Sequence, residues 1–429
     1  MRVALKTLGC RVNEAELERW SRDFRAAGHS IVGPSAEVDL IVLNSCAVTH
    51  EAVRKSRTLL RRMHRENPRA KLVLSGCYAT LSGAEAASLG VDLVVRNEDK
   101  DRLVEIVQQE LNPEDMPALA TDPEAGSPLP SSRQRAFVKV QDGCRYRCTF
   151  CIVTVARGNE RSRPVEEIIG EINSLAERGT REVVLTGVHL GGYGSDLGST
   201  LDRLIRAILA ETNIHRLRLG SLEPWDLPDS FFELFQDERM MPHLHLPLQS
   251  GSDEILKRMA RRCKTAEFAR LVADARAAVS DLNITTDIIV GFPGENDEEW
   301  SRSLAFIEEM AFGHIHIFTY SPRAGTKAVT LPSPVPPAVK KTRSAALHLL
   351  AESGKEEFQR SFLGRCFPIL VEGGGRDRND GERVSLGYTP NYMRVEAGSP
   401  TNRINQILAV RLTRFDDSRG CLVGQFADA

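Results

Sequence analysis

Three cysteines near the middle of the chain, Cys144, Cys148 and Cys151, form a C-x-x-x-C-x-x-C run just after the strand-like segment Ala136 to Val140. Three thiolates at this spacing cannot all reach one metal from a regular strand or helix, so the run predicts a loop wrapped around an ion or a cluster. A structural zinc site normally has four protein ligands, whereas a cubic four-iron cluster held by three cysteines keeps one iron open. A zinc loop and three unrelated cysteines are the alternatives, and the zinc loop lacks a nearby fourth His or Cys.

Three further cysteines, Cys10, Cys46 and Cys77, each end a segment that reads as a strand. Parallel strands place their carboxyl ends on one edge of a sheet, so these cysteines should meet although they lie far apart in the sequence. Each also precedes a helix-like segment, whose N-terminal amides suit the negative charge of a thiolate-bound cluster. A buried core cysteine is the alternative for any one of them. Their equivalent positions at three strand ends favour a second cluster site.

Residues 1 to 111 alternate between segments typical of strands and of helices. The expected strands are 2–8, 38–43, 71–74 and 91–95, and the expected helices are 13–27, 50–65, 83–88 and 100–111. Such alternation predicts a parallel sheet with right-handed crossovers. The unbroken apolar run Val38 to Leu43 is typical of a strand that is buried on both faces. Residues 112 to 132 are rich in Pro, Gly and Ser and read as a linker.

The same alternation returns at larger scale from Gln134 to about Arg323. The expected strands are 136–140, 182–186, 216–219, 243–247, 285–290 and 314–319, and helices such as 164–178, 297–310 and 335–360 accompany them. Six such units are too few for a closed eight-unit barrel, and barrels of this type carry their chemistry at the carboxyl ends of the strands. Gly187, Glu223 and Gln249 follow three of these strands and should surround one mouth. We expect His189, His243 and His245 to be packing or surface residues.

Beyond residue 362 the helical period disappears. The short segments 366–371, 382–388, 392–395, 407–412 and 421–426 alternate with Gly, Asn and Asp turns, which predicts a small β-barrel. Barrels of this size often bind oligonucleotides, and a purely structural cap is the alternative. The remaining cysteines, Cys263, Cys366 and Cys421, follow no ligand pattern, and we assign them no function.

The composition is that of a globular protein, with 41% hydrophobic and 27% charged residues and a formal net charge of -2 over 429 residues. No apolar run is long enough to cross a membrane and no signal peptide opens the chain, so we expect a cytoplasmic protein. Nine cysteines in that compartment favour metal ligands over disulfides. Basic residues gather at 54–65, 157–163 and 257–264, where each group could contact phosphates or form only a solvated helix face. Arg157, Arg161 and Arg163 are the first candidates for phosphate contacts because they follow the cysteine loop closely.

The spacing of the cysteine loop, with Phe150 just before its last cysteine, resembles the motif of the radical S-adenosylmethionine (SAM) enzymes. The segments Thr7–Asn13, Asn44–Thr49, Ser75–Tyr78 and Gly387–Tyr392 extend the likeness over nearly the whole chain, which resembles the bacterial tRNA methylthiotransferases that act on threonylcarbamoyl-adenosine. The resemblance implies an α/β fold with four parts. These are an N-terminal parallel α/β cluster domain (1–111), a linker (112–132), an open (βα)6 radical-SAM partial barrel (133–361) and a small RNA-binding TRAM β-barrel (362–429).

The resemblance also implies SAM and two 4Fe–4S clusters as cofactors. One cluster would be held by Cys144, Cys148 and Cys151, and the other by Cys10, Cys46 and Cys77. SAM contacts would come from Phe150, Gly187, Glu223, Gln249 and Asp287, any of which could instead be structural, and no catalytic residue is expected beyond the cluster ligands. The first cluster would reduce SAM to a deoxyadenosyl radical that removes the hydrogen at carbon two of adenine, and the second would hold the sulfur for insertion there.

The implied partners are a tRNA modified beside its anticodon, a flavodoxin- or ferredoxin-like electron donor and a separate sulfur source. Two other substrates stay open within the enzyme class, an isopentenyl-adenosine tRNA and a ribosomal-protein aspartate. A non-catalytic iron–sulfur protein that binds RNA or carries electrons is the alternative from a different class.

Overall fold

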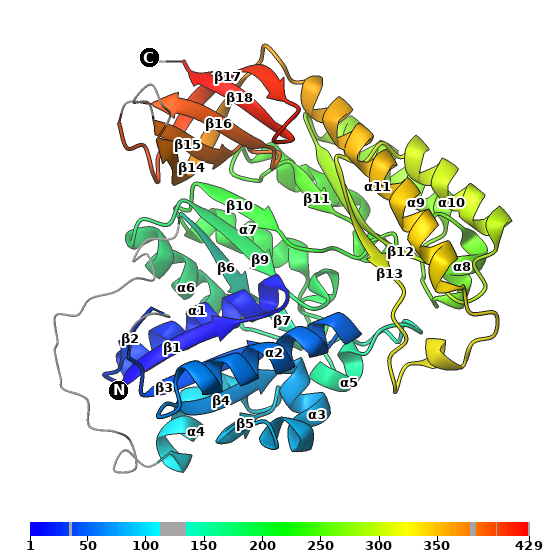
Figure 1. Cartoon of the computed structure of the whole chain (residues 1–429). Helices are drawn as coiled ribbons and strands as arrows, with labels where there is room; N and C mark the ends of the chain where they lie inside the picture. Colours follow the sequence, from blue (N-terminus) through cyan, green and yellow to red (C-terminus); the bar gives the residue numbers. More distant parts are fainter. Residues whose placement is uncertain (34–36, 112–133, 378–382, 400, 428–429) are drawn as a thin grey trace. The chain divides into compact units, whose positions relative to one another are not determined.

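The computed structural model describes residues 1–33, 37–111, 134–377, 383–399 and 401–427 (Figure 1). The chain divides into two compact units. The N-terminal unit comprises Met1–Ser131, Gln141–Arg161 and Ser321–Val329, and the barrel unit comprises Ser132–Val140, Ser162–Tyr320 and Thr330–Ala429. The expected linker, residues 112–132, lies outside the described residues. No helix in the described ranges is both long enough and apolar enough to cross a membrane.

The N-terminal unit contains a parallel five-stranded sheet with the order β2-β1-β3-β4-β5 (Figure 1). Its strands are β1 (Arg2–Thr7), β2 (Ser30–Ile31), β3 (Leu40–Ser45), β4 (Lys71–Gly76) and β5 (Leu93–Val95), and its helices are α1 (Arg11–Ala26), α2 (His50–Glu66), α3 (Cys77–Ala87), η1 (Lys100–Arg102) and α4 (Leu103–Glu110). The predicted parallel α/β fold is confirmed. The two-residue strand β2 was not predicted, because two residues show no periodicity. Helix α3 begins at Cys77, six residues before the predicted start at Gly83.

The burial of strand β3 on both faces explains why its sequence is apolar without interruption. Leu40 and Val42 pack into the cluster that α1 and α4 cover, whereas Ile41 and Leu43 pack into the cluster that α2 and α3 cover. Both faces of the strand are therefore buried, as in other parallel sheets between helices. The short strand β7 (Gln141–Asp142) and helix α5 (Val153–Arg157) also belong to this unit. Ala156 of α5 packs in the same apolar cluster as α2 and α3.

The barrel unit contains six parallel strands in chain order. They are β6 (Arg135–Lys139), β9 (Glu182–Thr186), β10 (Arg216–Leu219), β11 (His243–His245), β12 (Asn283–Val290) and β13 (His314–Thr319). They form two three-stranded sheets, β10-β9-β6 and β11-β12-β13, and single parallel bridges such as Ser221 to His245 connect these sheets. This arrangement confirms the predicted open six-stranded barrel.

Helices accompany the barrel strands. They are α6 (Val165–Glu177), α7 (Leu201–Glu211), α8 (Asp253–Arg258), α9 (Thr265–Ala278), α10 (Asp297–Glu309) and α11 (Pro337–Arg360). Short elements complete this part of the chain: β8 (Arg161–Ser162), η3 (Leu190–Gly192), η4 (Pro224–Asp226), η5 (Asp229–Gln236) and η6 (Lys327–Thr330). The helix α11 packs along β13, the last strand of the barrel (Figure 1).

The end of the chain forms a closed five-stranded barrel with the order β14-β15-β16-β18-β17 (Figure 1). Its strands are β14 (Cys366–Asp377), β15 (Arg383–Tyr388), β16 (Arg394–Ser399), β17 (Ile407–Asp416) and β18 (Cys421–Phe426). The predicted small β-barrel is confirmed. Apolar side chains such as Ile369, Val395 and Val410 fill its interior.

This terminal barrel docks against the amino ends of the six parallel strands. Arg216, the first residue of β10, donates to the Pro368 carbonyl at 2.7 Å, and Arg218 donates to the Pro390 carbonyl at 2.9 Å. Asn283, the first residue of β12, donates to the Asn391 carbonyl at 2.8 Å. Three bonds from two strands to main-chain carbonyls fix the terminal barrel at this end.

A buried carboxylate organises the same junction. Glu182, the first residue of β9, lies 2.8 Å from both Arg135 Nε and Arg218 Nε, and 3.7 Å from Arg216. Burial alone would raise the pKa of Glu182, but the three arginines outweigh this effect and lower the pKa to about 2. The Arg218 guanidinium also lies 4.5 Å above the ring of Tyr392 from the terminal barrel.

Candidate functional site

The three N-terminal cysteines stand at the carboxyl ends of three neighbouring strands. Cys46 and Cys77 directly follow β3 and β4, which pair in register up to Ser45 and Gly76, and Cys10 follows β1 at the N-cap of α1. Burial, together with the neighbouring Cys77 and Cys10, raises the pKa of the Cys46 thiol to about 11. The fold therefore brings three distant thiols into electrostatic contact at one sheet edge.

Glycines allow the chain to turn at this edge. Gly76 has φ +94°, and a Cβ atom there would lie only 2.3 Å from the Ser45 carbonyl oxygen. A Cβ atom on Gly9 would lie 2.8 Å from Asn13 Nδ2 and 3.1 Å from Cys46 Cβ. Only glycine fits at either place, because any side chain would collide with the neighbouring strand end. The repeated Gly-Cys pair is the sequence signal that could have indicated these turns.

Two asparagines contact the cysteines, and the sequence alone did not single them out. The Cys10 thiol donates to Asn13 Oδ1 at 3.5 Å, while Asn13 Nδ2 donates to the carbonyls of Leu8 and Ser45. Asn97 Nδ2 lies 3.8 Å from the Cys77 sulfur. The side chains of Asn13 and Asn97 thus hold the ends of different segments around the cysteines. Outer contacts of this kind orient ligands and tune a bound cluster.

The second group of cysteines lies on the loop between β7 and α5, in the same unit. The loop is closed by its own main chain, since Cys151 N donates to Cys148 O at 3.0 Å and Cys144 N donates to Gly158 O at 3.2 Å. Tyr146 N lies 3.4 Å from the Cys144 sulfur. Gly143 has φ +74°, and a Cβ atom there would lie 1.9 Å from the Asn159 carbonyl oxygen. The three cysteines are half-buried, so the loop shields its sulfurs without enclosing them.

All nine cysteines lie in the described ranges, and within those ranges none is joined in a disulfide. Each of the two sites offers three thiolates, which is the ligand set of a 4Fe–4S cluster with one open iron. The main-chain amide at the Cys144 sulfur and the asparagine amide at the Cys77 sulfur would stabilise bound thiolates. Both donor sets therefore fit iron–sulfur clusters.

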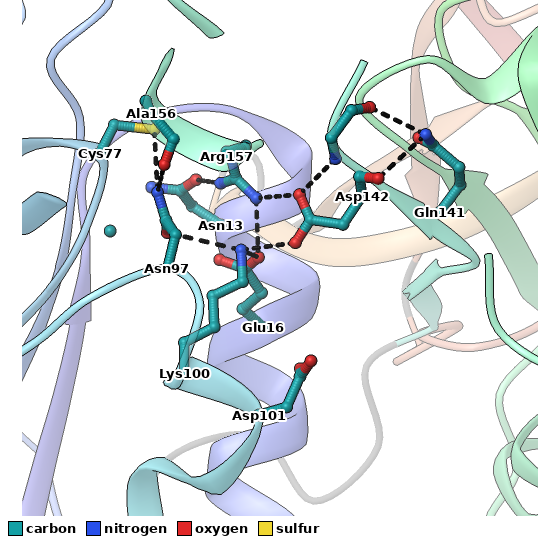
Figure 2. A network of polar contacts seen from close by, with 12 residues as sticks. Asn13, Glu16, Cys77, Asn97, Lys100, Asp101, Gln141, Asp142, Ala156 and Arg157 are labelled. Atoms are coloured by element: carbon teal, nitrogen blue, oxygen red, sulfur yellow. Dashed lines mark hydrogen bonds and ion pairs between the residues drawn. The ribbon is translucent and has the colours of Figure 1, made fainter. Parts of the chain in front are cut away.

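A buried ion network lies beside the N-terminal cysteines and reaches Asp142, two residues before Cys144 (Figure 2). Arg157, at the end of α5, donates to Glu16 at 2.9 Å, to Asp142 at 3.0 Å and to Asn13 Oδ1 at 2.8 Å. Lys100 Nζ lies 2.5 Å from Glu16 Oε1 and 2.7 Å from Asp142 Oδ2. All four charged side chains are nearly inaccessible to solvent, and two cations balance two carboxylates.

The electrostatics of Arg157 follow from this network. Burial by itself would lower its pKa, but Glu16 and Asp142 reverse the effect, and the ionised forms of Cys77 and Cys10 add to it. The pKa of Arg157 therefore stands well above its ordinary value. A fixed positive charge next to two thiolates would offset the negative charge of a cluster bound there.

The three arginines expected to contact phosphates have different surroundings. Arg157 is buried in the network, and this placement argues against the expected phosphate contact. The sequence could not indicate this, because Glu16 lies 141 positions away. Arg163 is half-buried and donates to the Lys139 carbonyl and to Glu171. Arg161 is exposed and is the member of the group that a phosphate could reach.

In the barrel unit, the expected SAM contacts lie along the carboxyl edge of the strands. Gly187 directly follows β9, Glu223 follows β10, and Gln249 follows β11 with φ +76° and a bridge to Ile288 of β12. Asp287 lies within β12, before its end. The expected Phe150 belongs to the cysteine loop in the N-terminal unit.

Two histidines that we expected to pack or lie on the surface instead face carboxylates. His189 Nε2 lies 2.6 Å from Asp226 Oδ2 and 3.6 Å from Glu223 Oε2, and burial raises the pKa of Glu223. His245 Nε2 lies 3.2 Å from Asp287 Oδ1. These pairs join residues of different strand ends, so no local spacing could reveal them. Two of the expected SAM contacts, Glu223 and Asp287, thus each have a histidine partner.

Comparisons with known proteins agree with this geometry. The Radical SAM superfamily model matches residues 138–307, and the model of Uncharacterized protein family UPF0004 matches residues 2–96. The threonylcarbamoyladenosine tRNA methylthiotransferase MtaB of Thermotoga maritima is 37% identical over 86% of this chain and 86% of its own length. The tRNA-2-methylthio-N(6)-dimethylallyladenosine synthase of Paracoccus denitrificans is 35% identical over 95% of this chain and 94% of its own.

Among solved structures, the radical SAM methyltransferase TsrM from Kitasatospora setae is similar in fold. It has a TM-score of 0.54 and 14% identity, and the match covers 74% of this chain and 72% of that one. The relatives, both family models and the two three-cysteine sites lead to one assignment. This chain belongs to the radical-SAM tRNA methylthiotransferase family.

Proposed function

We propose that this protein is a tRNA methylthiotransferase that modifies threonylcarbamoyl-adenosine beside the anticodon. The observation that carries the proposal is the pair of three-cysteine sites within one compact unit. The reaction replaces the C2–H bond of adenine by a C2–SCH3 bond, with the methyl group from SAM and the sulfur from a separate source. The relative from Thermotoga maritima, which carries this substrate in its name, supports the choice of substrate.

As a member of this family, the protein uses SAM and two 4Fe–4S clusters. We assign one cluster to Cys144, Cys148 and Cys151, and the other to Cys10, Cys46 and Cys77. When bound, the loop cluster and SAM supply the radical chemistry that an unactivated C–H bond requires. The chain's own residues orient the ligands: Asn13 and Asn97 hold the cysteine ends in place, and Arg157 offsets their negative charge.

We assign SAM binding in the barrel unit to the carboxyl edge of its strands, with Gly187, Glu223, Gln249 and Asp287 as contacts, and Phe150 beside the cluster. The six strand ends at this edge are where barrels of this type bind their ligands. The two histidines that face Glu223 and Asp287 would fix the orientation of these carboxylates.

The proposed domains are a cluster domain (1–111), a linker (112–132), a radical-SAM domain (133–361) and an RNA-binding TRAM barrel (362–429). A flavodoxin- or ferredoxin-like protein would supply electrons, and a separate donor would supply sulfur. A tRNA substrate places the enzyme in the cytoplasm.

Iron analysis tests the assignment of the clusters. Anaerobically prepared wild-type protein should bind about eight irons per chain, because each three-cysteine site holds a four-iron cluster. Alanine variants of either cysteine triplet should each retain about four irons. Only the loop variant should lose cleavage of SAM to deoxyadenosine. If the wild type holds about four irons that all depend on the loop, the N-terminal cysteines do not form a cluster site.

Nucleoside analysis tests the substrate. We expect 2-methylthio-threonylcarbamoyl-adenosine in tRNA from cells that carry the gene and not from cells that lack it. The similarity to the Paracoccus denitrificans protein makes dimethylallyl-adenosine tRNA the second candidate. If cells that lack the gene lose the methylthio group only from dimethylallyl-adenosine, the substrate is dimethylallyl-adenosine tRNA and the proposed substrate is wrong.

A further inference from the structure

The N-terminal unit contains a groove of about 490 Å³ that the proposed site does not use. It lies between α2, the kinked middle of α3 and the segment Ser321–Val329. Its size falls within the range of about 300–1,000 Å³ that is typical of small-ligand pockets. Its lining combines arginines with an apolar floor: Arg54, Arg57, Arg61, Arg323, Val53 and Leu81.

The groove lies close to both cysteine sites of the same unit. Helix α2 begins four residues after Cys46, and α3 begins at Cys77. The segment Ser321–Val329 completes the groove and is hydrogen-bonded at both ends, from His50 N to the Ser321 hydroxyl at 3.4 Å and from Ala328 N to Thr149 O on the cysteine loop at 2.8 Å. A ligand in this groove would therefore lie beside the strand ends that carry the cysteines.

The groove is positively charged, and its arginines differ in how they are held. Arg57 pairs with Glu85 and donates to the Tyr78 hydroxyl at 3.2 Å, which fixes its position. Arg54 and Arg61 are exposed, and within the part of the chain that the structure describes no carboxylate lies at salt-bridge distance from either. No carboxylate lines the groove. Arg54 and Arg61 can therefore bind an anionic ligand without breaking an ion pair.

Among the four arginines that line the groove, Arg323 is the one with a buried donor atom, Nε, that lacks a hydrogen-bond partner among the described residues. Burial lowers the pKa of Arg323, and the nearby Cys46 thiol, when ionised, opposes this shift. Buried donors nearly always have an acceptor, so this guanidinium lacks one that a ligand could supply.

We propose that this groove binds a single-stranded nucleotide of the anticodon loop, next to the adenosine that is modified. The inference rests on the proposed function. Arg54, Arg61 and Arg323 would bind the phosphates. The base would stack on a guanidinium plane, as bases of unpaired RNA do, and would contact Val53 and Leu81 beside it. An acidic peptide would use the arginines but would need no apolar floor.

Binding measurements on the full-length protein with both clusters test this inference. We would compare wild type with Arg323→Gln and with the double variant Arg54→Gln, Arg61→Gln, using a fluorescent anticodon stem-loop that carries threonylcarbamoyl-adenosine. We expect about tenfold weaker binding for each variant. The slope of log affinity against log salt should fall by about 0.7 for each lost contact with a phosphate of a single strand. Arg323→Lys keeps the charge and should retain most of the slope.

Arg62→Gln is the matched control. Arg62 is exposed on the same helix and pairs with Glu66, but it does not line the groove. Iron content and SAM cleavage without RNA should be unchanged in every variant. If the groove variants bind like Arg62→Gln while the wild type modifies the RNA, the groove is not an RNA site although the proposed function holds. If the wild type neither binds nor modifies the RNA, the proposed function fails and this inference fails with it.

A second RNA locates the contact. A stem-loop with uncharged methylphosphonates at both linkages that flank the modified adenosine should bind wild type and Arg323→Gln with equal affinity, because the phosphate that Arg323 binds is then neutral. If Arg323→Gln still weakens binding of this RNA tenfold, its partner is not a flanking phosphate, and the proposed position of the nucleotide is wrong.

Discussion

Both units contain a buried ion network at one end of a parallel sheet, but the two networks stand at opposite ends of their strands. In the N-terminal unit, Arg157, Lys100, Glu16 and Asp142 lie at the carboxyl edge, where the cysteines meet (Figure 2). In the barrel unit, the network of Glu182 lies at the amino edge, where the terminal barrel docks. The first network lies beside the proposed cluster site, whereas the second joins two barrels.

The two networks also differ in the charged groups that they contain. The first contains two cations and two carboxylates and is neutral by itself, and its Arg157 is the cation that interacts with ionised Cys77 and Cys10. The second places Glu182 among three arginines, of which Arg135 also pairs with Glu372, while Arg216 and Arg218 donate to main-chain carbonyls. Buried charge therefore lies beside the proposed cluster ligands in one unit and joins two barrels in the other.

The largest expected effect concerns the first network. Arg157→Ala leaves Glu16 and Asp142 with one cation, and removal of a partner from a buried ion network costs about 3–5 kcal/mol. Urea unfolding of the cluster-free protein should show this loss, and the iron bound by the N-terminal cysteines should decrease with it. Arg161→Ala, an exposed neighbour, should change the free energy of unfolding by less than about 0.5 kcal/mol. Equal effects of the two variants would mean that the network does not support the site.

The second network predicts a pH dependence. The folded pKa of Glu182 is about 2, below its ordinary 4.5, so its stabilisation is complete above pH 4.5 and is lost as the pH falls towards 2. The loss should amount to about 3 kcal/mol. Urea unfolding at pH 6, 4 and 2.5 would measure it.

Glu182→Gln should be less stable at pH 6 and should lack this part of the acid sensitivity, without loss of cluster iron at neutral pH. Glu177→Gln, at an exposed position on α6, should follow the wild type at all three pH values. A loss of iron in Glu182→Gln would contradict the separation of the two networks.

A third substitution separates steric from conformational effects at the carboxyl edge. Gly76→Ala combines a positive φ with a contact of 2.3 Å to the Ser45 carbonyl oxygen, and we expect a cost of about 2–3 kcal/mol. Gly28 also has a positive φ, +81°, but no atom lies within 4 Å of its Cβ position. Gly28→Ala should therefore cost only about 1 kcal/mol. Thermal unfolding of both variants would test this, and similar costs would show that φ alone matters.

The smallest expected effect is on redox potential. Asn97→Leu removes the amide 3.8 Å from the Cys77 sulfur, and hydrogen bonds to cluster sulfurs favour the reduced state. Loss of about 0.5–1.5 kcal/mol should lower the midpoint potential of the N-terminal cluster by about 20–60 mV. A redox titration followed by electron paramagnetic resonance would measure it. The loop cluster should not change, and neither cluster should change in Asn67→Leu, whose amide caps α2.

The sequence predicted what is local or periodic. The cysteine loop has a fixed spacing, and β3 has a continuous apolar run, so the loop and the parallel sheet followed from neighbouring residues. The meeting of Cys10, Cys46 and Cys77 followed from one further rule about the ends of parallel strands. The surroundings of these cysteines did not follow, because Arg157 and Glu16 lie 141 positions apart in the sequence. Arg323 joins the groove from a segment more than 250 positions away from α2.

The position of the terminal barrel sets a length requirement for the substrate. It is fixed to the amino ends of strands whose carboxyl ends carry the proposed SAM site, and β12 alone has eight residues. At about 3.3 Å per residue this strand spans about 26 Å. An RNA that touches the terminal barrel while its adenine reaches the SAM edge must bridge that length. A free nucleoside is therefore too short to contact both the terminal barrel and the carboxyl edge of the strands, whereas a folded anticodon arm is long enough.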